Sequence, residues 1–193
     1  MNITALILAA GASSRMGSPK ALLTYKGETF LDRLIASCQQ ACGKVVVVLG
    51  NHSDAILAGI KHQPRFVQNP DPDRGQLSSL QCGLFGVEGP ALFVPVDLAA
   101  IQSATIQQLV AAFQEANPLI AVPQFGGKHG HPVCVGQSVV KELLALPAGA
   151  QARDVIHNHR AETLYVEVDD PAILRDIDSR IDYSNLLAEA TRP

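Results

Sequence analysis

A short apolar segment, Ile3–Leu8, leads directly into a loop of small and cationic residues, Ala9–Lys20. The segment has the length of a strand, and a helical stretch follows the loop. Small residues let backbone N–H groups approach a phosphate closely, while Arg15 and Lys20 could neutralise its charge. This unit is therefore suited to an anionic ligand, although an ordinary polar surface loop is the alternative interpretation.

Strand and helix patterns alternate along most of the sequence. The run Val45–Val48 is apolar at every position, which is typical of a central parallel strand covered on both faces. Further strands are expected at 65–68, 91–96, 119–122, 133–135 and 163–168, and helices at 29–41, 53–60, 76–85, 103–115, 138–146, 152–158 and 181–190. This order predicts a three-layer, doubly wound α/β fold with a mostly parallel sheet. At 193 residues we expect a single domain, 1–193.

Composition narrows the class of partner. The net charge of −3 and the pI of about 6.0, with no basic run, argue against nucleic acid. No apolar run approaches the roughly 20 residues that span a bilayer, and the apolar N-terminal stretch lacks the positive charge of a signal peptide. The four cysteines show no metal-binding spacing and are interpreted as small apolar residues in a reducing compartment. We therefore expect a cytoplasmic protein without a membrane partner.

Four polar segments follow successive predicted strands. They are the loop 11–20, the segment 69–79, the single residue Asp97 and the loop 126–132. Ligands of open α/β sheets bind beyond the carboxyl ends of the strands. The four segments are therefore expected to meet at one crevice.

Asp97 ends a buried strand, where an unpaired carboxylate would be costly. Mg²⁺ would remove that cost, because it binds hard oxygen ligands and commonly uses one or two carboxylates together with phosphate oxygens. The alternative is that Asp97 caps the helix that follows. A zinc site formed by His129 and His131 is not favoured, because two histidines lack a third ligand.

The order of residues in this loop is a more specific signal than the composition of the loop. It reads Leu8-Ala9-Ala10-Gly11-x-x-x-Arg15-Met16-Gly17-x-x-Lys20. It matches neither the dinucleotide fingerprint nor the P-loop. It resembles the signature of the nucleotidyltransferases that join a nucleoside triphosphate to a phosphorylated acceptor, and most closely that of the MobA-like branch. The resemblance implies a Rossmann-like nucleotidyltransferase fold, with Arg15 and Lys20 as catalytic residues.

The resemblance also implies a set of ligand-binding residues. An Asp at the position of Asp97 and a late Asp-x-Asp, here ending at Asp178, hold Mg²⁺ in such proteins. Asp176 and Asp182 are interpreted as cap or surface charges, and all three late carboxylates could instead be solvated. The residues expected to bind nucleotide are Ala9, Ala10, Gly11, Ala12, Asn69, Gly75, Ser78 and Ser79, and those expected on the acceptor side are Gly130 and His131. Ala99 departs from the family, where a Pro is common, and could reshape the acceptor side.

The function implied is Mg²⁺-dependent transfer of a nucleoside monophosphate, with release of pyrophosphate. Within the family, Ala10 before Gly11 favours CTP over GTP, and molybdopterin is the first choice of acceptor, with a molybdoenzyme or its chaperone as a further partner. The alternatives are a pyrophosphorylase that makes a nucleotide-activated sugar or alcohol, and a non-catalytic nucleotide- or cofactor-binding assembly protein. A Rossmann oxidoreductase would fit the fold but lacks its three-glycine fingerprint.

Overall fold

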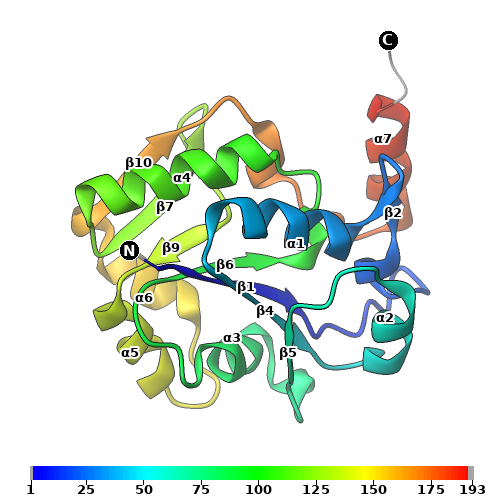
Figure 1. Ribbon diagram of the computed structural model, residues 1–193, viewed down its shortest axis with the longest axis horizontal. Helices are drawn as coiled ribbons and strands as arrows, with labels where there is room; N and C mark the ends of the chain where they lie inside the picture. The colour runs from blue at the N-terminus through cyan, green and yellow to red at the C-terminus, as the bar shows by residue number, and fades with distance from the viewer. Residues whose placement is uncertain (1, 191–193) are drawn as a thin grey trace.

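An eight-stranded sheet runs through the centre of the molecule in the order β10-β7-β9-β6-β1-β4-β5, with β8 paired to β7 (Figure 1). The structure is a computed structural model that describes residues 2–190. The strands of this sheet are β1 (Thr4–Ala9), β4 (Lys44–Leu49), β5 (Arg65–Gln68), β6 (Ala91–Pro95), β7 (Ile120–Phe125), β8 (Lys128–His129), β9 (Val133–Val135) and β10 (Thr163–Glu167). A separate hairpin joins β2 (Thr24–Tyr25) to β3 (Glu28–Thr29).

Seven α-helices surround the sheet within the described residues: α1 (Phe30–Ala41), α2 (Ser53–Gly59), α3 (Gln76–Leu84), α4 (Ser103–Ala116), α5 (Gln137–Ala145), α6 (Ala152–Asn158) and α7 (Arg180–Ala190). Short 3₁₀ turns include η1 (Lys20–Leu22), η3 (Val96–Leu98) and η5 (Pro171–Leu174). None of the helices between residues 2 and 190 combines the length and the apolar character that a membrane crossing requires.

The central strands are parallel. β1 lies between β4 and β6, with Leu6 opposite both Val46 and Phe93. Only β8 and β9 run antiparallel to their neighbours in this sheet, across the described residues. The predicted mostly parallel α/β fold is therefore confirmed. The parallel strands end at the same edge, so the loops after β1, β4 and β6 are brought together there.

The two faces of the sheet bury alternate residues of each strand. On β1, Ile7 joins the cluster beneath α1 and α4, whereas Leu6 joins the cluster above α3 and α5. Figure 1 shows these two helix pairs on opposite sides of the sheet. The uninterrupted valines of β4 follow from this arrangement, because both faces of that strand are covered.

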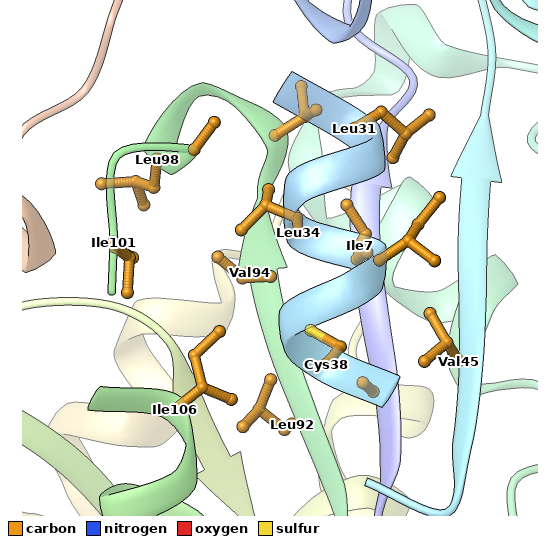
Figure 2. Packing of buried hydrophobic residues seen from close by; sticks show 14 of the residues in the cluster. Ile7, Leu31, Leu34, Cys38, Val45, Leu92, Val94, Leu98, Ile101 and Ile106 are labelled. Atoms are coloured by element: carbon orange, nitrogen blue, oxygen red, sulfur yellow. The ribbon is translucent and has the colours of Figure 1, made fainter. Parts of the chain in front are cut away.

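Helix α1 packs along the centre of one face. Its buried residues Leu31, Leu34 and Cys38 point toward Ile7 and Val94 of the neighbouring strands (Figure 2). Burial raises the pKa of the Cys38 thiol, so this cysteine is a packing residue rather than a reactive one.

Two details refine the local structure expected from the sequence. Ser103 is suited by residue type to cap the helix expected at 103–115, but it is the first helical residue of α4, and its hydroxyl lies 2.6 Å from that of Ser37. Gln102 is the cap residue, and its backbone N–H donates to the buried carboxylate of Asp170. The expected loop 126–132 begins as the turn of a hairpin between β7 and β8, since two glycines with positive φ allow the tight turn between them.

Candidate active site

A cleft of about 330 Å³ lies at the carboxyl edge of the sheet. The loop after β1 forms one wall, the start of α3 forms another, and the segment after β6 closes the far side. Most of the predicted site residues line it, namely Ala9, Ala10, Gly11, Ala12, Arg15, Lys20, Gly75, Ser79, Asp97 and Asp178. The expected crevice is thus formed by segments far apart in the sequence.

Lys20 lies at the centre of the charged residues in this cleft. Its Nζ is 3.0 Å from Oδ2 of Asp97 and 2.5 Å from Oδ1 of Asp178. Burial alone would lower the pKa of Lys20, but hydrogen bonds and charge interactions with the two carboxylates outweigh it and raise that pKa. Lys20 is therefore a firmly charged ammonium at the point where two carboxylates converge.

The loop after β1 is held in shape by its own hydrogen bonds. The N–H of Lys20 donates to Oγ of Ser13 at 3.0 Å, and the N–H of Met16 donates to the Ser13 carbonyl at 2.9 Å. At Gly11, an added Cβ would meet no described atom within 4 Å. The backbone there faces open space in which a phosphate could approach it closely. The Arg15 side chain is 71% exposed and lies 3.5 Å from Asp178.

The two carboxylates come from distant segments that contact each other. Asp97 lies in η3 and does not cap α4, which excludes the alternative role as a cap of that helix. The N–H of Ile177 donates to the Asp97 carbonyl at 3.1 Å, and this bond places the following Asp178 beside Asp97. The hydrogen bond from Lys20 lowers the pKa of Asp178. Desolvation and the charges of Asp97 and Asp178 raise the pKa of Asp176.

The arrangement of oxygen atoms fits a divalent cation. Asp97 and Asp178 direct one carboxylate oxygen each at a single cation, which is the Lys20 ammonium. Within residues 2–190, no three acidic, histidine or cysteine side chains form a closed metal site. Mg²⁺ does not need such a cage, because it is commonly held by one or two carboxylates together with phosphate oxygens.

Asn69 and Ser78 lie beneath the cleft rather than in its lining. Asn69 is 2% exposed, and its side-chain amide donates to Oγ of Ser78 at 2.9 Å and to Oγ of Ser79 at 3.0 Å. Ser78 in turn donates to the Gly75 carbonyl at 2.8 Å. This network fixes the first turn of α3, and Ser79 and Gly75 are the members that face the cleft.

Gly130 and His131 line a second cleft, of about 490 Å³. The second cleft adjoins the first, and the charge of Asp97 acts on His131, so the expected crevice consists of two neighbouring clefts. Gln76 lines both clefts and marks their junction. Burial lowers the pKa of His131, and its Nδ1 is buried without a hydrogen-bond partner among the described residues.

Gln76 lies in the segment 69–79, which the sequence places at the crevice, and the structure brings it to the cleft at the start of α3. One residue beside the site, Arg180, escaped sequence reasoning. Arg180 donates a hydrogen bond from Nε to the Met16 carbonyl at 3.3 Å, across 164 positions of sequence. No local pattern indicates such a contact.

A three-layer α/β fold with cations and carboxylates around a glycine-containing loop is typical of nucleotide-binding proteins, and similarity to known proteins shows the class. The chain belongs to the MobA-like NTP transferase domain family, whose model matches residues 5–163, and such proteins are nucleotidyltransferases. It is 26% identical over 183 residues to molybdenum cofactor cytidylyltransferase of Escherichia coli (strain K12), covering 94% of this chain and 93% of that protein.

Two further similarities bear on nucleotide and metal. A molybdenum cofactor guanylyltransferase of Xanthomonas euvesicatoria is 34% identical over 113 residues, which are 58% of this chain and 55% of that protein. A crystal structure of Rv0371c from Mycobacterium tuberculosis, in complex with manganese, matches with a TM-score of 0.78 and 25% identity over 97% of this chain and 99% of that chain. A protein of similar structure thus binds a divalent metal.

Proposed function

We propose that this protein transfers CMP from CTP to the phosphate of molybdopterin, with Mg²⁺ as the metal, and releases pyrophosphate. The observation that carries the proposal is the convergence of Lys20, Asp97 and Asp178 beside the loop after β1. The full-length similarity to a cytidylyltransferase of the molybdenum cofactor supports the choice of donor and acceptor.

The chain's own residues would position the triphosphate and neutralise its charge. The exposed Arg15 and the loop backbone at Gly11 and Ala12 face the cleft, where they can bind phosphate oxygens. Phosphoryl and nucleotidyl transfer depend on positioning and charge stabilisation more than on covalent catalysis. Lys20 would move from the carboxylates to the phosphates, since its side chain already lies at the cleft wall.

Asp97 and Asp178 would hold the metal ion. When bound, a divalent cation would orient the α-phosphate toward the acceptor phosphate and offset the charge on both. The carboxylates would exchange one cation for another in this step, because the Lys20 ammonium contacts the same oxygens.

The acceptor would lie mainly in the second cleft. Apolar and aromatic residues such as Phe93, Val122 and Tyr165 form much of its wall, and Tyr165 stacks on His129 with ring centroids 4.1 Å apart. Such walls suit a planar heterocycle. The acceptor phosphate would then reach the first cleft past Gln76.

Ala10 is expected to influence base choice indirectly. Ala10 is 3% exposed and packs with Leu8 and Leu80 beneath the loop, although it also borders the cleft. The Ala10 methyl group would therefore affect the choice of base by fixing the position of the loop backbone, without contacting the base itself. The base edge would be read largely by the exposed Gln76 and by Ser79.

The test is pyrophosphate release from each of CTP, GTP, ATP and UTP with molybdopterin and Mg²⁺. The proposal requires that CTP be the best donor and that the reaction depend on the acceptor. Activity with a phosphorylated sugar or alcohol in place of molybdopterin would favour the pyrophosphorylase alternative. Nucleotide binding without turnover on any acceptor would favour an assembly protein.

A further inference from the structure

The segment 177–183 links the cleft to the C-terminal helix. The N–H of Ile177 donates to the Asp97 carbonyl, which holds the start of this segment beside η3. Asp178 then lines the cleft, and the first turn of α7 follows. Figure 1 shows α7 standing next to β2, at the side of the sheet rather than on one of its faces. Leu186 is the one buried residue among the described residues of this helix, and Arg175 pairs with Glu189 near its C-terminal end.

The start of α7 is fixed by two sets of hydrogen bonds. Asp182 accepts from both the N–H and the hydroxyl of Ser179, at 2.8 and 2.7 Å, and its own N–H donates back to Ser179 at 3.2 Å. This reciprocal pattern is a capping box. The Tyr183 hydroxyl donates to the Thr24 carbonyl at 2.7 Å, and its ring meets Phe30 edge to face at 5.9 Å. Arg180 therefore extends from a backbone anchored on both sides.

Arg180 reaches from this anchor to the loop after β1. Its Nε donates to the Met16 carbonyl at 3.3 Å. Its guanidinium also covers Gly17, where the backbone has φ of +72° and an added Cβ would lie 2.8 Å from Nη2 of Arg180. Gly17 thus meets two requirements at once, a left-handed backbone and room for the arginine. Arg180 does not line the cleft, so it contacts the loop from outside.

We propose that Arg180 is a positioning residue that holds Met16 and Gly17 in place, so that the neighbouring Arg15 and Lys20 keep the geometry that binds triphosphate. It acts through the loop and does not touch the nucleotide. The segment 177–183 also supplies Asp178, so one anchored segment positions both the loop after β1 and a carboxylate of the site. This inference rests on the proposed function only where it predicts that Arg180 affects the binding of CTP.

The experiment compares Arg180→Met and Arg180→Lys with the wild type and with Arg65→Met. Arg65 is an exposed arginine at the start of β5, at the edge of the sheet opposite the loop after β1, so it is a matched control for the loss of one arginine. In Arg180→Met we expect hydrogen exchange at the backbone amides of residues 14–18 to accelerate on the order of tenfold without any ligand, because a charge-assisted hydrogen bond is lost. We expect CTP to bind about tenfold more weakly with little change in Tm. Arg180→Lys should recover part of both effects, and Arg65→Met should show neither.

The outcomes separate this inference from the proposed function. If Arg180→Met leaves both loop exchange and CTP affinity unchanged while the wild type binds CTP, Arg180 has no positioning role. Loss of affinity in step with a large fall in Tm, with no rescue by lysine, would show a purely structural role and also overturn the inference. If the wild type fails to bind CTP, the proposed donor is wrong, and accelerated loop exchange in Arg180→Met still supports the positioning role.

Discussion

Replacing Lys20 with methionine should affect catalysis and metal binding in opposite directions. Methionine keeps much of the length of the side chain but removes the ammonium that Asp97 and Asp178 share. Turnover should fall on the order of 10²-fold or more, the scale for loss of one preorganised charge-stabilising group. Binding of Mn²⁺ in the absence of nucleotide should become tighter, because the metal no longer competes with Lys20.

The size of the gain in metal affinity follows from the two ion pairs. The side chains of Asp97 and Asp178 are 22% and 42% exposed, so solvent screens both contacts with Lys20. Exposed pairs of this kind are each worth about 0.2 to 1 kcal/mol. Their combined loss, about 0.4 to 2 kcal/mol, corresponds to roughly 2- to 30-fold tighter binding of Mn²⁺.

Isothermal titration with Mn²⁺ and steady-state pyrophosphate release measure the two effects. Lys44→Met is the control, because Lys44 is an exposed residue at the start of β4, at the opposite edge of the sheet. Weaker Mn²⁺ binding in Lys20→Met would refute the reasoning that metal and ammonium share these oxygens. Near-wild-type turnover would remove Lys20 from the catalytic residues.

The remaining predictions concern other side chains of the site and one of the core. Arg15→Ala should lower turnover on the order of 10²-fold with an unchanged circular dichroism spectrum; a rate close to that of the wild type would contradict its role. Asp97→Asn should abolish metal-dependent activity at little cost in Tm, and Asp178→Asn should weaken metal dependence less; full activity of Asp97→Asn would place the metal elsewhere. Ala10→Gly should change the ratio of kcat/KM for CTP and GTP by less than about tenfold, since the methyl is buried and one methyl is worth only ~1–3 kcal/mol even in direct contact; a wild type that favours GTP would overturn the assigned base. Asp32 is 1% exposed, and although burial alone would raise its pKa, hydrogen bonds from His62 and Thr29 lower it. Its stabilisation is therefore complete above the unfolded pKa of about 3.9 and is lost as pH falls through the lower folded value. Urea unfolding should show Asp32→Ala less stable by about 1 to 3 kcal/mol at pH 7, because its donors lose their acceptor, with the difference shrinking below pH ~4; an equal difference at all pH values would refute this account.

Local sequence was enough to predict the architecture. Unbroken apolar runs such as Val45–Val48 identify strands covered on both faces, and alternation with helical patterns implies parallel connections. Because parallel strands end at one edge, the positions of Lys20 and Asp97 after their strands already predicted that they would share a cleft, and the structure brings them to 3.0 Å.

The tertiary structure decided which side chains pair and which face the cleft. Lys20 and Asp178 are 158 positions apart, and their contact exists because Ile177 is bonded to the strand end at Asp97. Local sequence likewise could not show that Asn69 is buried beneath α3 or that Gly130 lies in a second cleft. The residue types and their order along the strands specify which groups reach the edge of the sheet. Which of these groups contact one another depends on packing between distant segments, and the periodicity and spacing of the sequence carry no information about that packing.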